Sequence, residues 1–203
     1  MCGRYLIDDS ISDNELYAAL YNSGVSVGGK SAKRGEIFPT DAAPVLVNGG
    51  KDLTASLMIW GFTKFSGKGV IINARAETAR EKPMFANAIK FRRCVVPSSG
   101  FYEWRHDSRG KATEKLLFRL ESKPVLYMAG LYKVATGFNG ATNERPEPRF
   151  VVLTREPNDI MRPVHNRMPV ILPADALTSW ISDDSFIDFA FSYEVDGMYY
   201  CSA

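Results

Sequence analysis

Short runs of apolar residues, some of them alternating with polar ones, dominate the chain. Such runs predict strands, and Leu53, Ala55, Leu57 and Ile59 alternate as in a strand with one buried face. The turn residues Asn48-Gly49-Gly50 favour a hairpin between this run and the preceding one. The predicted strands cover residues 2–7, 43–47, 53–62, 70–73, 93–97, 100–105, 115–121, 125–132, 149–154 and 193–201.

Helical patterns are fewer. The range 11–21 predicts a helix with Ser12 as N-cap, Glu15 as its capping-box partner, and a hydrophobic staple between Ile11 and Leu16. Two further helices are predicted over 78–92, where Pro83 blurs the start, and over 173–181.

Many strands without regular β-α-β alternation predict an α+β fold, with a largely antiparallel, barrel-like β core and peripheral helices. The loop 136–148 resembles a linker but is too short to separate domains, so we expect one domain over residues 1–203.

Composition removes several function classes. The 25 Lys and Arg residues against 23 Asp and Glu residues give a net charge of +2, so any binding of nucleic acid must be local. Three widely spaced cysteines, Cys2, Cys94 and Cys201, fit neither a disulfide framework nor a metal site. Without an apolar leader or a long apolar run, the sequence predicts a cytoplasmic protein with no membrane partner, no metal and no cofactor.

Candidate chemistry lies in four polar segments at predicted strand ends or loops. They are CGR at 2–4, NARAE at 73–77, GFYEW at 100–104 and HNRMP at 165–169. Each has an ordinary structural explanation when taken singly: a free cysteine is usually a small buried hydrophobe, an asparagine satisfies a turn, and a glutamate pairs with an arginine.

Taken together and in this order, the four segments resemble the signature of the SOS response-associated peptidase (SRAP) family, the abasic-site-processing proteins. The resemblance implies a monomeric α+β domain that acts in the DNA damage response, binds single-stranded DNA and attaches covalently to abasic sites. It also implies the residue roles. Cys2 is the nucleophile, supported by Asn73 and Glu103, and His165 acts on the sugar; Arg4, Arg75 and Arg167 contact phosphates, Trp60 and Trp104 stack on bases, and Pro39 is part of a loop wedge.

The chemistry of Cys2 agrees with this resemblance. Removal of Met1 leaves an amine and a thiol on one residue, and an abasic deoxyribose opens to an aldehyde. The amine forms a Schiff base and the thiol closes onto the same carbon, which gives a thiazolidine ring. Reference pKa values of about 7.7–8.0 and about 8.5 keep both groups reactive near neutral pH.

Two structural alternatives stay open for the DNA-contacting residues. Arg167 is equally well explained by an ion pair with a nearby glutamate, and we expect only one of Trp60 and Trp104 to stack on bases, because a tryptophan in a strand is more often core. The segment after Trp60-Gly61 is also shorter than the form common in the family and lacks its proline and second tryptophan, which indicates a reduced wedge.

Three other functions compete with abasic-site crosslinking. An N-terminal-nucleophile amidotransferase also exposes a cysteine followed by glycine, and a glutaminase assay separates it. A noncovalent reader of single-stranded or modified DNA would leave Cys2 structural, and covalent trapping separates it. A cysteine peptidase would pair Cys2 with His165, and removal of Met1 by the chain itself is the expected form of such an activity.

Overall fold

The computed structural model describes residues 2–12, 14–22, 24–64, 68–121, 123–135 and 147–203. Its strands are β1 (Arg4–Ile7), β2 (Ser26–Val27), β3 (Lys30–Ser31), β4 (Gly35–Ile37), β5 (Ala42–Asn48), β6 (Leu53–Trp60), β7 (Phe62–Thr63), β8 (Val70–Ile71), β9 (Asn73–Arg75), β10 (Arg93–Ser98), β11 (Gly100–His106), β12 (Ala112–Leu120), β13 (Leu126–Ala135), β14 (Glu147–Arg155), β15 (Met168–Pro169), β16 (Ile171–Leu172) and β17 (Met198–Ser202). Its helices are α1 (Asp9–Ser12), α2 (Glu15–Asn22), α3 (Pro83–Phe91), α4 (Leu177–Ser182) and α5 (Phe186–Ser192), with 3-10 turns at Ala76–Thr78 and Ala174–Ala176.

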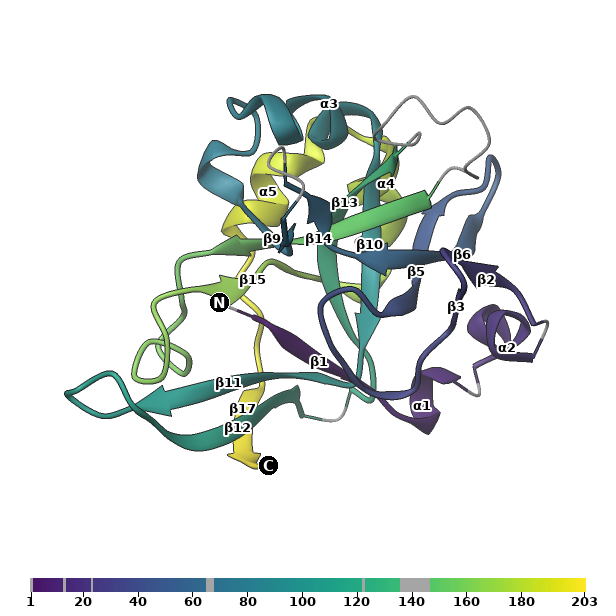
Figure 1. The fold of residues 1–203 in the computed structure, drawn as a ribbon. Coiled ribbons are helices and arrows are strands. Elements are labelled where there is room, and N and C mark those ends of the chain that lie inside the picture. Colours follow the sequence, from purple (N-terminus) through teal and green to yellow (C-terminus); the bar gives the residue numbers. More distant parts are fainter. Residues whose placement is uncertain (1, 13, 23, 65–67, 122, 136–146) are drawn as a thin grey trace.

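A closed barrel forms the core of the molecule. Its strands pair in the cycle β5, β6, β14, β13, β10 and back to β5. All of these pairs are antiparallel except β6 with β14, and β14 also pairs in parallel with β9. The helices lie at the periphery (Figure 1). The predicted α+β class with a largely antiparallel, barrel-like core is therefore confirmed.

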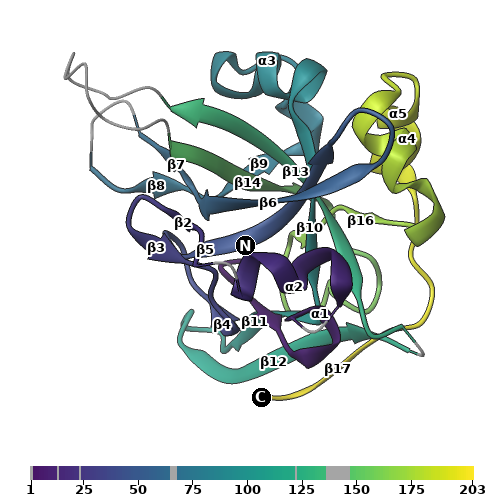
Figure 2. The ribbon, with the colours of Figure 1, turned by 90° about the vertical axis from the view of Figure 1, so that its right-hand side faces the viewer.

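A second sheet, with strand order β17-β12-β11-β1-β4, lies at one end of the barrel. Helix α3 lies at the opposite end, and both views of the ribbon agree on this arrangement (Figure 2). The second sheet matters for function because β1 starts just after Cys2 and β11 carries Glu103.

The predicted hairpin is present with the expected turn. Asn48 is opposite Leu53, and the N–H of Gly49 donates to the carbonyl of Asp52 at 3.0 Å. The expectation of a single buried face is wrong for the second half of β6, where Met58 and Trp60 are as buried as their neighbours. The barrel interior takes one face of this half, and helix α2 and strand β2 pack near the same strand.

The first predicted helix begins later than the sequence pattern indicates. Ser12 ends α1, and the carbonyl of Asn14 accepts the first bonds of α2, from Tyr17 at 2.9 Å and Ala18 at 2.8 Å. Asn14 is therefore the N-cap, a position that asparagine favours. The predicted capping box and staple involve side chains outside the described residues.

Other boundaries also shift. The predicted helix 78–92 begins as helix α3 only at Pro83, which occupies the first turn, where its missing N–H costs nothing. The final strand is shorter than predicted, and helix α5 precedes it without having been predicted. Most of the predicted loop 136–148, and residues 65–67 of the shortened segment, lie outside the described residues.

Candidate active site and nucleic-acid contacts

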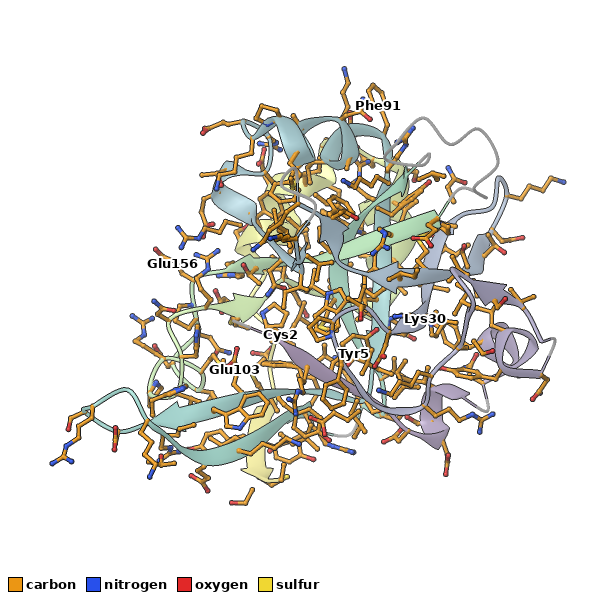
Figure 3. The ribbon with its side chains drawn as sticks, viewed as in Figure 1. Cys2, Tyr5, Lys30, Phe91, Glu103 and Glu156 are labelled. Carbon is orange, nitrogen blue, oxygen red and sulfur yellow. The ribbon has the colours of Figure 1, made fainter. Side chains whose placement is uncertain are left out.

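Cys2 lies immediately before β1, and its side chain is 1% exposed. Its thiol donates a weak hydrogen bond to the carbonyl of Arg4, with 3.7 Å between sulfur and oxygen. Figure 3 shows Cys2 at the start of β1, on the side of β11 and its residue Glu103. Burial raises the pKa of the Cys2 thiol, and the carboxylate of Glu103 raises it further. The thiol is therefore protonated at neutral pH.

Asn73 reaches Cys2 from the barrel. It is the first residue of β9, where it is opposite Val152 of β14. Its side-chain nitrogen donates to the carbonyl oxygen of Cys2 at 3.0 Å. Its side-chain oxygen is buried and has no hydrogen-bond partner among the described residues. One half of this amide thus holds the Cys2 backbone, and the other half is an available acceptor.

Glu103 is on the buried face of β11 and is 4% exposed. On the same face, Phe101 packs in the core, because alternate residues of a strand point to the same side. Gly100 at the start of β11 permits close approach of β12, since a Cβ there would lie 2.6 Å from the carbonyl oxygen of Phe118. The glycine of the GFYEW segment therefore helps to set the strand that places Glu103.

His165 is the fourth of the predicted catalytic residues. Its ring Nδ1 accepts a hydrogen bond from the backbone N–H of Arg167 at 3.0 Å, so the proton of the neutral ring is on Nε2. Burial lowers the pKa of His165, although the carboxylate of Glu103 opposes this shift. The charge of Glu103 thus acts on both Cys2 and His165. Asn73 contacts Cys2 directly, and the catalytic roles of all four residues stay predictions.

The three predicted phosphate contacts differ in their surroundings. Arg75 is exposed and forms no ion pair with another described residue. Arg4 pairs with Glu36 at 3.0 Å, and its guanidinium lies 4.1 Å from the ring centre of Phe38. Arg167 forms a bidentate ion pair with Glu77, at 2.7 and 2.8 Å. The ion-pair alternative for Arg167 is thus present in the structure, and its contact with phosphate stays a prediction.

The two tryptophans separate clearly. Trp60 is fully buried, donates its indole N–H to the carbonyl of Ile72 at 3.1 Å and stacks on Phe150 with 6.3 Å between ring centres. The expectation that Trp60 contacts DNA is therefore corrected: barrel packing covers both faces of its ring. Trp104 is only partly buried, with the Arg4 guanidinium 5.3 Å and the Lys115 ammonium 5.9 Å from its ring centre.

Pro39 is partly exposed in the turn between β4 and β5. The next residue, Thr40, has a positive φ of 74°, which is unusual for a residue with a branched side chain. The N–H of Thr40 donates to the carbonyl of Trp60 at 2.8 Å, and its carbonyl accepts from Lys30. The turn is therefore held in place, and a wedge role for Pro39 stays a prediction.

Sequence reasoning missed three charged residues beside the site. Glu36 joins Arg4 and Lys115, with both distances at 3.0 Å. Partial burial would raise the pKa of Glu36, but the hydrogen bonds from Lys115 and Arg4 outweigh it and hold the pKa below its ordinary value. No local pattern marks Glu36 or Lys115. Glu77 lies within the NARAE segment, and a search for opposite charges between that segment and HNRMP would have paired it with Arg167.

No group of three or more His, Cys, Asp or Glu side chains in the described ranges is placed to hold a metal ion. Within the same part of the chain, no helix combines the length and apolar character needed to cross a membrane.

Comparison with known proteins places this geometry in a family. The sequence model of the family described as SOS response associated peptidase (SRAP) matches residues 1–189. The abasic site processing protein YoaM of Bacillus subtilis is 29% identical over 221 residues, covering 98% of this chain and 88% of YoaM. The abasic site processing protein YoqW of the same organism is 29% identical over 196 residues, covering 90% of this chain and 80% of YoqW.

A solved structure supports the same fold. The crystal structure of a protein from Bacteroides thetaiotaomicron aligns with a TM-score of 0.76 at 19% identity, covering 99% of this chain and 91% of that one. The family match spans all four segments that meet around Cys2. The chain therefore belongs to the SOS response associated peptidase (SRAP) family.

Proposed function

We propose that this protein processes abasic sites in single-stranded DNA by forming a covalent bond with them through Cys2, once Met1 has been removed. The proposal rests above all on one observation, the meeting of a second-position cysteine with a buried carboxylate and an imidazole. It also rests on family membership, because the related YoaM and YoqW are named abasic site processing proteins.

The amine of Cys2 reacts first in this proposal. Its lone pair attacks the aldehyde carbon of the open-chain sugar, and loss of water from the resulting carbinolamine gives an imine. The thiol then adds across the C=N bond, with sulfur going to carbon and the thiol proton to nitrogen, which closes a thiazolidine. The raised pKa of the buried Cys2 thiol supports this order, because it disfavours a thiolate as the first nucleophile.

Glu103 and His165 are suited to move the protons that these steps require. Carbinolamine formation and dehydration each need proton transfer at the amine or at the leaving oxygen. The Glu103 carboxylate, close to Cys2, accepts a proton from the attacking amine. The Nε2–H of neutral His165 donates toward the sugar oxygen as the ring opens or as water leaves.

Asn73 orients the nucleophile without adding charge. Its nitrogen already holds the Cys2 carbonyl, so the residue bearing the amine and thiol is fixed on one side. Its buried oxygen lacks a protein partner among the described residues and is available to accept a hydrogen bond from the freed amine of Cys2. The amide thus serves the backbone of Cys2 on both sides of its Cα.

DNA binding is proposed for two arginines near the site, the exposed Arg75 and the half-buried Arg4. Arg75 follows Asn73 by two residues and is free of ion pairs within the described part of the chain, so it is the arginine best placed for a backbone phosphate. Arg4 is beside the partly buried Trp104, which offers a face for an unstacked base.

The test is a denaturing gel with a single-stranded oligonucleotide that carries one abasic site. We expect a slowly migrating, heat-resistant adduct with wild-type protein and none with Cys2→Ala. Cys94→Ser and Cys201→Ser are matched controls, because each removes a thiol that has no neighbouring amine, and both should crosslink as wild type does. An oligonucleotide without the abasic site controls for noncovalent binding.

Two results would redirect the proposal. Binding without any adduct would favour a noncovalent reader of DNA. An adduct that forms equally well with Cys2→Ala would place the linkage on another nucleophile. Intact mass of the same preparation checks the processing step, since a chain that reacts while keeping Met1 contradicts attack by the Cys2 amine.

A further inference from the structure

An ion pair joins the two segments that carry Asn73 and His165. Glu77 follows β9, which begins at Asn73, and Arg167 follows His165 by two residues. The guanidinium of Arg167 binds both carboxylate oxygens of Glu77, at 2.7 and 2.8 Å. These hydrogen bonds also lower the pKa of Glu77. The segments are 90 residues apart in the chain, so this pair is a long-range connection within the site.

The same guanidinium is anchored to the barrel. Its Nη2 donates to the carbonyl of Thr154 in β14 at 2.6 Å. In the register of β14, Thr154 is opposite both Arg75 of β9 and Pro169 of β15. The Arg167 side chain is only 12% exposed, so it is held on two sides rather than free in solvent.

The backbone of Arg167 in turn contacts His165. Its N–H donates to Nδ1 of the imidazole at 3.0 Å, which favours the tautomer with the proton on Nε2. The contacts of the Arg167 side chain with Glu77 and Thr154 restrain the residue whose backbone N–H binds the imidazole. This connects the carboxylate of Glu77 to the protonation pattern of His165.

We propose that Glu77 is a positioning residue that, through Arg167, holds His165 in the Nε2–H tautomer. The inference deepens the proposed function, because it rests on His165 acting at the sugar. A partly exposed ion pair of this kind contributes little to stability, but a bidentate Arg–carboxylate pair fixes geometry in a way that a single contact does not.

Glu77→Gln tests the inference with little change in shape. The amide keeps one acceptor for Arg167 but loses the charge and the second acceptor. With the bidentate pair lost and the contact with Thr154 remaining, Arg167 holds its backbone N–H less firmly against Nδ1. The neutral imidazole of His165 then divides between its two tautomers.

Nitrogen NMR of the free protein, labelled at histidine, reads this directly. The chain has two histidines, so His106→Gln assigns the signals. At about pH 8, where an imidazole is neutral, we expect one protonated Nε2 and one unprotonated Nδ1 for His165 in wild type. Glu77→Gln should move both shifts toward intermediate values.

Asp188→Asn is the matched control. Asp188 forms an ion pair with Arg80 at 2.8 Å that does not involve the site, so its loss should leave the His165 signals unchanged. Wild-type signals in Glu77→Gln would overturn the inference and show that the local turn alone sets the tautomer. Intermediate signals in wild type, or equal changes in both variants, would overturn it as well.

Crosslinking of the same variants separates this inference from the proposed function. Glu77→Gln should slow adduct formation on the order of 10-fold, because a less well positioned reacting group lowers the rate. Its affinity for intact single-stranded DNA should not fall, because no positive charge is removed. A tautomer change without any adduct from wild type would retain the positioning role and reject the proposed reaction.

Discussion

The thiol of Cys2 is in surroundings that keep it protonated. It is buried, and the nearby carboxylate of Glu103 disfavours a second negative charge. A cysteine at position 2 suggests a reactive thiol from sequence alone, yet reactivity toward a general electrophile depends on the thiolate and on access. A buried, protonated thiol agrees with the proposed order of steps, in which the amine of Cys2 reacts first.

Alkylation rates should reflect this difference between the cysteines. Cys201 is exposed, whereas Cys2 and Cys94 are buried and burial raises the pKa of both thiols. We expect iodoacetamide to modify Cys201 first in the folded protein, and all three at similar rates in denaturant. Peptide mass spectrometry at short times measures the order. Modification of Cys2 as fast as Cys201 would contradict the protonated, buried thiol.

Glu103 is the residue whose charge matters most to the proposed proton transfers. Glu103→Gln keeps the shape but cannot accept a proton, so adduct formation should slow by about 10²–10⁴-fold. Glu114→Gln is the control, since Glu114 is on the neighbouring strand and pairs with half-buried Arg105. Single-turnover crosslinking rates give the comparison. Equal rates for wild type and Glu103→Gln, with folding intact, would remove Glu103 from the reaction.

Residue-scale prediction succeeded where several motifs coincided and failed where a single residue was judged by type. Cys2, Asn73, Glu103 and His165 were identified together; Asn73 contacts Cys2 and the charge of Glu103 acts on Cys2 and His165, while their roles stay predictions. The sequence could not tell which of Trp60 and Trp104 faces solvent. Trp60 is buried because the barrel closes around it, and no local pattern indicates that closure. The pairing of Arg167 with Glu77 joins distant segments, which no local pattern specifies.

At the scale of elements, local signals identified most strands and left the helix boundaries uncertain. The Asn48-Gly49 turn fixed its hairpin because turn chemistry and alternation agreed. Helix α2 begins after Asn14 although Ser12 and Glu15 form an equally good capping sequence. Helix α5 escaped prediction because its aromatic-rich sequence also resembles a strand.

Arg93 connects two helices that the sequence did not link. Its side chain is 2% exposed, and its guanidinium donates to carbonyls near the ends of α3 and α4 and to Asp184. Arg93→Ala leaves these carbonyls without donors, so we expect a loss of about 3 kcal/mol in the free energy of unfolding. Urea denaturation followed by circular dichroism measures it.

Asp184→Asn separates the two contributions of this cluster. Asp184 is 61% exposed, so its ion pair with Arg93 should contribute no more than about 1 kcal/mol. A small loss in Asp184→Asn beside a large loss in Arg93→Ala is the expected pattern. Near wild-type stability in Arg93→Ala would show that water replaces the guanidinium at these helix ends.

At the scale of the whole molecule, the fold class was predictable, but the strand pairing that closes the barrel was not. The number of strands and the absence of regular alternation indicated a barrel-like α+β fold. The parallel pairing of β14 with β6 and β9 brings together segments that are far apart in sequence, so single-sequence patterns carry no trace of it. This pairing places Asn73 beside Cys2. A single domain over residues 1–203 stays a prediction.

Binding to single-stranded DNA should depend on a few local cations, because the net charge is only +2. Arg75→Ala should weaken binding and reduce the salt slope by about 0.7, the value for one phosphate contact with a single strand. Arg4→Ala should have a smaller effect, because Glu36 already neutralises Arg4. Fluorescence anisotropy over a salt series measures both. Unchanged affinity and slope in Arg75→Ala would make that arginine an ordinary surface residue.

The central claim is that both the amine and the thiol of Cys2 bond to one sugar carbon. The most direct measurement is mass spectrometry of the crosslinked N-terminal peptide after treatment with borohydride and a thiol-alkylating agent. A thiazolidine predicts a peptide that begins at Cys2, gains no hydrogen from borohydride and takes no alkyl group. A reduced linkage with an alkylated Cys2 thiol, or attachment at Cys94, Cys201 or a lysine, would contradict it.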